Sequence, residues 1–222
     1  MAHVLVAIPS NPRHPEALRA QAHMLAARLP EANPDHTLDI QIVDTPIEVP
    51  TDSPIYTRHA TIRNHVIDTR LRGHEWVLWI DSDLCDYPAD LPTTLLQHGC
   101  IAAPMVTLDH HGERFYDIGG FIEHGRRARM GPPWFDQAGP VIELESVGCC
   151  YVIPAWLYRV GIRYAPPPYR LTTQDQHGTV GAYVVEHWSV MRQAAARGVR
   201  IVALTDVRAV HAWLPDYGIE PN

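Results

Sequence analysis

Two carboxylates one residue apart, Asp81 and Asp83, directly follow the apolar run Trp-Val-Leu-Trp-Ile at residues 76–80. Such a run is typical of a buried strand, and in open α/β sheets ligands bind beyond the carboxyl ends of the strands. Two acidic groups this close repel each other unless a cation joins them. The spacing therefore predicts a site for Mg²⁺ or Mn²⁺, which takes oxygen ligands and shares them with substrate phosphates. The alternative is an Asp-rich turn with no ligand.

Strand-like and helix-like segments alternate around this motif. The expected strands are 3–8, 38–43, 75–81, 100–106, 141–147, 199–204 and 207–211, and the expected helices are 15–29, 57–71, 91–97 and 183–197, the last ended by Gly198. Residues 152–160 predict a strand that turns into a short helix at Pro154. Because strands and helices alternate along the chain, the pattern favours an α/β fold with a parallel sheet and right-handed crossovers.

Two segments break this regularity. Residues 107–140 contain Gly-Gly, Arg-Arg and Gly-Pro-Pro sequences, which predict a loop or hairpin region. Residues 172–181 are polar and contain glycine, and their length suits either an active-site lid or an ordinary surface loop.

The length of 222 residues fits a single domain with a sizeable core. No apolar stretch is long enough to span a bilayer, and the N-terminus lacks the basic and apolar regions of a signal peptide. We therefore expect a soluble, cytoplasmic protein. The four cysteines show no metal-type spacing, so we expect reduced and mostly buried thiols.

Charge narrows the chemistry of any phosphate site. The net charge of −7 argues against broad capture of a nucleic-acid backbone, although a local basic strip remains compatible with it. All 18 fixed positive side chains are arginines, because the chain has no lysine. A phosphate clamp must therefore use arginine, a metal or backbone N–H groups, and Schiff-base chemistry on lysine is excluded.

Taken in order, the motifs resemble the GT-A fold of nucleotide-sugar glycosyltransferases. The motifs are Pro9-Ser10 after the first strand, Arg63-Asn64 on a helix, the strand ending in Asp81-Ser82-Asp83, Glu186 and a late His211. Within that fold the chain is most similar to the fungal mannan polymerase type. The resemblance implies a Rossmann-like, mixed and mostly parallel sheet flanked by helices, with an irregular acceptor side. It makes residues 1–222 one domain, with 1–106 the nucleotide-sugar-binding half and 107–222 the acceptor-binding half.

The resemblance also implies roles for these residues. Asp83 and His211 would ligate Mn²⁺ or Mg²⁺, and Asp81 would reach the donor ribose or a metal-bound water. The cation would bridge the diphosphate of the nucleotide sugar and stabilise the leaving nucleotide. Arg58 and Arg63 are candidates to bind the same phosphates, although a solvated helix face is the alternative for each. Pro9 and Ser10 would lie against the donor.

One position departs from the family pattern. Many inverting members have Glu-Asp where this chain has Glu186-His187, and the Asp serves as the base for the acceptor hydroxyl. Three hypotheses follow: His187 is the base as a neutral imidazole with its usual pKa of about 6.5, Glu186 is the base, or the enzyme retains configuration and needs no such base. The mannan polymerase resemblance favours retention. A structural alternative is that Glu186 caps the following helix.

Two rival functions stay open. A strand followed by Asp-x-Asp also begins haloacid dehalogenase-like phosphatases, with Asp81 as nucleophile and Asp83 as acid, but those enzymes place the motif on the first strand and usually require a lysine. The other rival is an inactive domain that only binds a nucleotide or glycan.

The acceptor is a glycan, a small molecule or a hydroxymethylated DNA base. The aromatic candidates to stack on it, or to pack in the core, are Trp134, Phe135, Tyr151 and Trp156. Residues 148–151 look like the acceptor-facing floor of the family.

Overall fold

The computed structural model describes residues 1–10, 14–44, 55–108, 115–116, 122–123, 126–127, 139–165, 172–174, 180–182 and 186–212. The strands are β1 (Ala2–Ser10), β2 (His36–Asp44), β3 (Trp76–Ile80), β4 (Leu84–Asp86), β5 (Ile101–Leu108), β6 (Ile122–Glu123), β7 (Arg126–Arg127), β8 (Val141–Glu143), β9 (Cys150–Pro154), β10 (Thr172–Gln174), β11 (Val180–Ala182) and β12 (Ile201–His211). The helices are α1 (Glu16–Ala32), α2 (Ile55–Arg70), α3 (Leu91–Leu96), α5 (Trp156–Arg159) and α6 (His187–Ala195).

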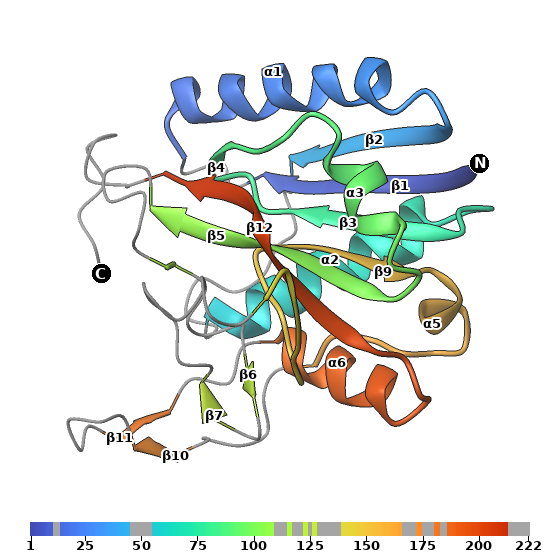
Figure 1. Cartoon of the computed structure of the whole chain (residues 1–222). Helices are drawn as coiled ribbons and strands as arrows, with labels where there is room; N and C mark the ends of the chain where they lie inside the picture. The colour runs from blue at the N-terminus through green and yellow to red at the C-terminus, as the bar shows by residue number, and fades with distance from the viewer. Residues whose placement is uncertain are drawn as a thin grey trace.

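An eight-stranded mixed sheet runs through the centre of the fold in the order β2-β1-β3-β9-β5-β12-β4, with β8 paired to β12 (Figure 1). Helices α1 and α3 cover one face, and α2, α5 and α6 cover the other. Strands β3, β5 and β9 are continuous apolar runs because both of their faces are buried. The expected α/β class, with a mixed sheet flanked by helices, is confirmed.

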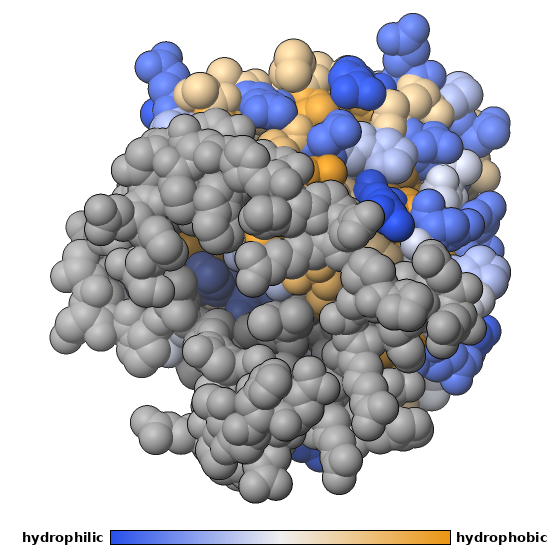
Figure 2. Space-filling view, turned by 60° about the vertical axis from the view of Figure 1, so that its left-hand side comes forward, coloured by the Kyte–Doolittle hydropathy of each residue, from blue (hydrophilic) through white to orange (hydrophobic). Residues whose placement is uncertain are grey.

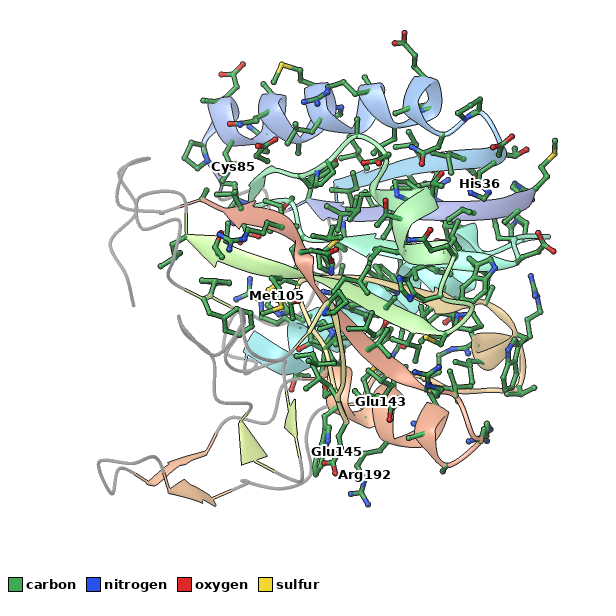
Figure 3. All side chains as sticks on the ribbon, viewed as in Figure 1. His36, Cys85, Met105, Glu143, Glu145 and Arg192 are labelled. Carbon is green, nitrogen blue, oxygen red and sulfur yellow. The ribbon has the colours of Figure 1, made fainter. Side chains whose placement is uncertain are left out.

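The two cores separate by strand alternation. Side chains of β1 alternate between them, so that Leu5 and Ala7 face α2 while Val4 and Val6 face α1. Met105 of β5 points to the same side as α2 and α6, as Figure 3 shows. All four cysteines are free and buried, as expected, and Cys85 of β4 lies beside the start of α1 (Figure 3).

Strand direction shows where the expected mixed, mostly parallel sheet departs from parallel order. β1 pairs in parallel with β2 and β3, and β5 pairs in parallel with β12, but β9 lies antiparallel between β3 and β5. An apolar run of five residues has the same appearance in either direction, so its sequence did not reveal the reversal. Because β9 is reversed, it begins at the edge where β3 ends: Cys150 pairs with Ile80.

The two short C-terminal strands predicted at 199–204 and 207–211 are one strand, β12. Leu204 and Arg208 pair with the consecutive residues Pro104 and Met105, so the intervening three residues bulge out and the strand continues. By contrast, the strand predicted at 141–147 is confined to β8. The Gly198 stop is confirmed, with a φ of 78° and a hydrogen bond from the Val199 N–H to the Ala194 carbonyl.

Helix α6 begins at His187, later than predicted, and residues 183–185 lie outside the described part of the chain. In the predicted lid, β10 and β11 form an antiparallel pair, and the residues that join them also lie outside it. None of the described helices is long and apolar enough to cross a membrane.

Candidate active site

The Asp81–Asp83 turn is held between two strands by backbone hydrogen bonds. The Asp81 N–H donates to the Cys149 carbonyl at 3.0 Å, and the Ala212 N–H donates to the Asp83 carbonyl at 2.8 Å. The Leu84 N–H closes the turn on the Asp81 carbonyl at 3.1 Å. Cys149 reaches its position with a φ of 44°, the left-handed region in which non-glycine residues are uncommon. The start of β9 and the end of β12 therefore fix the turn from both sides. Figure 2 brings this edge of the sheet forward and shows hydrophilic described residues among the apolar ones.

Asp81 is paired with a buried arginine. Arg63 of α2 is 4% exposed, and its Nη2 donates to Asp81 Oδ1 at 2.6 Å. Its Nε lies 3.3 Å from Glu186 Oε1, and the Glu186 side chain is 1% exposed. Burial raises the pKa of Asp81, Arg63 opposes that shift, and the neighbouring Asp83 adds to it. Burial also opposes ionisation of Glu186, but His187 and Arg63 outweigh it and lower its pKa. Arg63 therefore holds two carboxylates from separate elements at once.

Aromatic side chains form the floor beneath Arg63. Its guanidinium lies 4.9 Å from the centroid of the Trp79 ring and 5.8 Å from that of Tyr164. Trp79 Nε1 donates to the Tyr158 hydroxyl at 3.0 Å, and that hydroxyl lies 2.7 Å from the Tyr164 hydroxyl. Asn64 exchanges two hydrogen bonds with the Tyr164 backbone, at 2.8 and 2.9 Å. In the Arg63-Asn64 motif, the arginine therefore contacts Asp81, and the asparagine fixes the backbone of Tyr164 beneath it.

Asp83 is paired with imidazoles. His211 Nε2 lies 3.1 Å from Asp83 Oδ2, and His14 Nε2 lies 3.9 Å from the same oxygen. Burial opposes ionisation of Asp83, but the charge and hydrogen bond of His211, supported by His14, hold its pKa well below the usual range. Burial likewise opposes protonation of His211, but Asp83 raises its pKa. The ring of Tyr116 stacks on His211 with centroids 3.6 Å apart.

His187 lies in a buried position that weakens its imidazole as a base. It is 6% exposed, and burial lowers its pKa to about 3, with Glu186 opposing the shift and Arg63 adding to it. Its Nε2 lies 3.4 Å from Glu186 Oε1, and its Nδ1 lies 3.4 Å from the Tyr151 hydroxyl. The expected pKa of about 6.5 is therefore wrong. The alternative that Glu186 caps α6 is also wrong, since its side chain makes no capping hydrogen bond.

The other predicted site residues are placed as follows. Ser10 is buried at the end of β1, at the same edge as the end of β3, and the partly buried Pro9 precedes it. Arg58 is partly buried on α2 and shares none of the contacts that Arg63 makes. The structure thus joins Arg63, Asp81, Glu186 and His187 in one group and places Asp83 with His211 beside it.

Tyr151 and Trp156 are not placed where they could stack on an acceptor beside the aspartates. Tyr151 is fully buried, and its hydroxyl faces Tyr164 and His187. Trp156 is 42% exposed on α5, which follows the far end of β9, so it lies at the edge opposite the aspartates. Trp134 and Phe135 lie outside the described residues. Residues 148–151 do lie beside the Asp81–Asp83 turn, through the contact of Asp81 with Cys149.

Sequence reasoning missed three contributors: His14, Ser82 and Tyr116. Ser82 lies inside the aspartate motif and is 4% exposed, with its Oγ 3.3 Å from His14 Nδ1. His14 precedes Pro15 at the start of α1, and its signal in the sequence is only its place between the first strand and the first helix. Tyr116 has no such signal, since it reaches β5 through a bond from its N–H to the Val106 carbonyl.

The Asp83 side has the features of a cation site. Asp83 Oδ1 is buried and has no hydrogen-bond partner among the described residues, which is costly for a carboxylate oxygen unless a ligand meets it. His211 Nδ1 donates to the Ala212 carbonyl at 2.8 Å, so a neutral ring presents the Nε2 lone pair towards Asp83. Among the residues that the structure describes, no three His, Cys, Asp or Glu side chains already form a metal-holding group. Oxygen and imidazole ligands suit Mn²⁺, so the residues present fit the predicted cation.

The chain matches no protein-family model and no curated protein. It is similar to the solved structure of GalNAc-T7 with UDP, GalNAc and Mn²⁺, at 9% identity and a TM-score of 0.47, over 96% of this chain and 43% of that one. It is also similar to an active-site mutant of LgtC, at 14% identity and a TM-score of 0.34, over 71% of this chain and 59% of that one. A third similar structure is 4-diphosphocytidyl-2C-methyl-D-erythritol synthase, at 14% identity and a TM-score of 0.37, over 92% and 89% of the two chains.

This chain therefore spans less than half the length of the GalNAc-T7 chain. At these identities and TM-scores, the similarities do not bear on the activity or the substrate of this chain. None of the three is a mannan polymerase, so that narrower resemblance stays a prediction.

Proposed function

We propose that the chain is a metal-dependent glycosyltransferase of the GT-A type, which moves a sugar from a nucleotide-diphosphate donor to an acceptor hydroxyl. The observation that carries this proposal is the arrangement around Asp83. One of its oxygens is buried and has no hydrogen-bond partner in the described part of the chain, and the other faces His211 Nε2 at 3.1 Å, at the edge of the sheet where ligands of α/β folds bind.

In this proposal Asp83 and His211 hold Mn²⁺ or Mg²⁺, which when bound stabilises the negative charge of the leaving diphosphate. Arg63 keeps Asp81 ionised and oriented, so that Asp81 can accept a hydrogen bond from the donor ribose. Ser10 lies at the end of β1 and faces the donor from the neighbouring strand. No lysine is needed, because the fixed positive charge at the site comes from Arg63.

The same contacts favour retention of configuration. His187 is held neutral with a pKa of about 3, and Glu186 already accepts a hydrogen bond from Arg63. Both groups are therefore weaker bases than usual, which favours a transfer in which neither takes the proton of the acceptor hydroxyl. In a retaining transfer the leaving phosphate oxygen takes that proton, and the side chains need only position the two substrates.

A panel of nucleotide sugars tests this proposal. With Mn²⁺ present, one donor should release its nucleoside diphosphate, slowly to water and faster with a glycan, a small alcohol or a hydroxymethylated nucleobase as acceptor. The product should keep the anomeric configuration of the donor in proton NMR. The phosphatase rival predicts instead hydrolysis of a phosphate monoester that is lost in Asp81→Asn, and the binding-only rival predicts nucleotide binding without turnover. Either outcome would contradict the proposal.

A further inference from the structure

Asp83 meets a second imidazole, which the family pattern does not call for. His14 lies directly before α1 and is 9% exposed. Its Nε2 is 3.9 Å from Asp83 Oδ2, the same oxygen that His211 Nε2 approaches at 3.1 Å. Two rings from opposite ends of the chain therefore converge on one carboxylate oxygen.

These separations fit ligands that share one ion. With metal–ligand bonds of about 2.1 Å, two ligands of one octahedral ion lie about 3.0 Å apart when adjacent and about 4.2 Å apart when opposite. The 3.1 Å and 3.9 Å distances both fall within that span. At 3.9 Å His14 and Asp83 are too far apart for a direct hydrogen bond, and they form an ion pair only when His14 is protonated.

Both rings are engaged through their other nitrogen. His211 Nδ1 faces the Ala212 carbonyl at 2.8 Å, and His14 Nδ1 faces Ser82 Oγ at 3.3 Å. A carbonyl only accepts, so His211 carries its proton on Nδ1; a hydroxyl can accept as well, which allows the same tautomer in His14. Metal-binding histidines commonly donate from the second nitrogen in this way, which aims the free lone pair at the ion. The middle residue of the aspartate motif thus orients His14.

We propose that His14 is a third protein ligand of the cation, so that the site is built from two imidazoles and the Asp83 carboxylate. This inference rests on the proposed function, because it concerns the same cation. The described side chains do not form a ready-made group of three, so the proposal requires them to draw together around the ion. Two nitrogen ligands favour Mn²⁺ or Co²⁺ over Mg²⁺, which prefers oxygen ligands and retains its waters.

The experiment counts the nitrogen ligands of bound Mn²⁺ by pulsed electron paramagnetic resonance on the whole chain. Wild type should show ¹⁴N coupling from two imidazoles, and His14→Gln from one. His14→Gln should also bind Mn²⁺ at least about 10-fold more weakly in a metal titration, with little change for Mg²⁺. Ser82→Ala should weaken Mn²⁺ binding less than His14→Gln does. His23→Gln, a change of an exposed histidine on α1, is the matched control and should behave as wild type.

The outcomes separate this inference from the proposed function. Coupling from one imidazole in wild type, or equal Mn²⁺ affinity in wild type and His14→Gln, would overturn the role of His14 while leaving a metal-dependent transferase in place. No Mn²⁺ binding by wild type, even with UDP or GDP present, would overturn both. Circular dichroism of His14→Gln and its thermal midpoint establish that the variant is folded before its metal affinity is compared.

Discussion

Asp81 and Asp83 lie two residues apart in one turn, yet they face opposite kinds of partner. Asp81 accepts a hydrogen bond from Arg63 at 2.6 Å, and an arginine can neither lose its charge near neutral pH nor ligate a metal. Asp83 faces imidazoles, which can give up a proton and bind a cation. The two carboxylates of the motif therefore face different charges, with a fixed guanidinium beside Asp81 and, beside Asp83, imidazoles where our proposal places the cation.

The pKa shifts follow the same division. Burial raises the pKa of Asp81 against the opposing effect of Arg63, whereas the imidazoles lower that of Asp83 in spite of burial. On the Asp81 side the guanidinium is also shared with Glu186, which makes that side part of the folded core. The Asp81 side should accordingly contribute more to stability, and the Asp83 side more to metal binding.

Arg63→Met should produce the largest loss of stability. It takes the guanidinium away from the buried Glu186, which among the described residues keeps only the imidazoles of His187 and His59 nearby, and breaking a buried ion pair in this way costs about 3–5 kcal/mol. Urea unfolding at neutral pH in the presence of chelator measures the loss. Arg58→Met on the same helix is the matched control and should change the free energy of unfolding by less than about 0.5 kcal/mol.

The double variant Arg63→Met/Glu186→Gln sharpens this prediction. Removing the buried negative charge should recover part of the stability lost in Arg63→Met, and a double-mutant cycle isolates the coupling between the two side chains. Additive effects of the two changes would show that the contact is not an energetic pair.

Asp83→Asn should abolish metal-dependent turnover, by roughly 10²–10³-fold or more, because the leaving charge loses its stabilisation. It should leave the fold largely intact. Asp86→Asn, which changes an exposed carboxylate three residues along, is the control for charge and should keep wild-type turnover. Turnover of Asp83→Asn near the wild-type rate, with the same donor and Mn²⁺, would show that the motif is only a turn.

The pH dependence distinguishes the two sides further. The pKa of His211 is raised in the folded protein by its pairing with Asp83. This pairing stabilises the fold fully at pH values below the unfolded pKa of about 6.5. The stabilisation is lost as pH rises through the pKa of His211 in the folded protein. The same proton competes with a cation, so Mn²⁺ affinity should increase by about tenfold per pH unit below the folded pKa of His211. Calorimetric titrations from pH 5.5 to 8.5 measure this, and a flat profile would contradict the assignment of His211.

His187→Gln should have the smallest effect on turnover. Loss of a true general base costs roughly 10²–10⁴-fold, whereas we expect a change within about tenfold, since the ring is buried and neutral. Wild-type kcat should show no inflection that depends on His187 near pH 6.5. The turnover of His187→Gln is compared with that of Tyr151→Phe, which removes the hydroxyl facing His187 Nδ1 and leaves the imidazole in place. An inverted product together with an inactive His187→Gln would make His187 the base.

Much of this architecture could be read from local sequence. The apolar runs of β1 and β3, the aspartate turn and the helix stop at Gly198 all follow from periodicity and residue type. The reversed β9 could not be read, because its direction depends on pairing with distant β3 and β5. The continuity of β12 was hidden by its bulge, since the polar pair Thr205-Asp206 after Leu204 looks like a strand end.

The same limit applies to the site. His211 and Arg63 were expected at the site only through the resemblance to the GT-A fold, since a histidine at a strand end and an arginine on a helix carry no such signal by themselves. His14 and Tyr116 approach Asp83 and His211 only through the packing of α1 and the return of the chain to β5. Contacts of this kind join residues that are distant in sequence, and no local pattern encodes them.

The most direct test of the central claim is an isothermal titration of UDP and GDP into the chain, with Mn²⁺ and then with chelator. We expect one of the nucleotides to bind when Mn²⁺ is present and binding to disappear with chelator, because the cation that Asp83 and His211 would hold would supply positive charge to the diphosphate. Asp83→Asn should not bind that nucleotide in either condition. Equal nucleotide affinity with Mn²⁺ and with chelator would contradict the account.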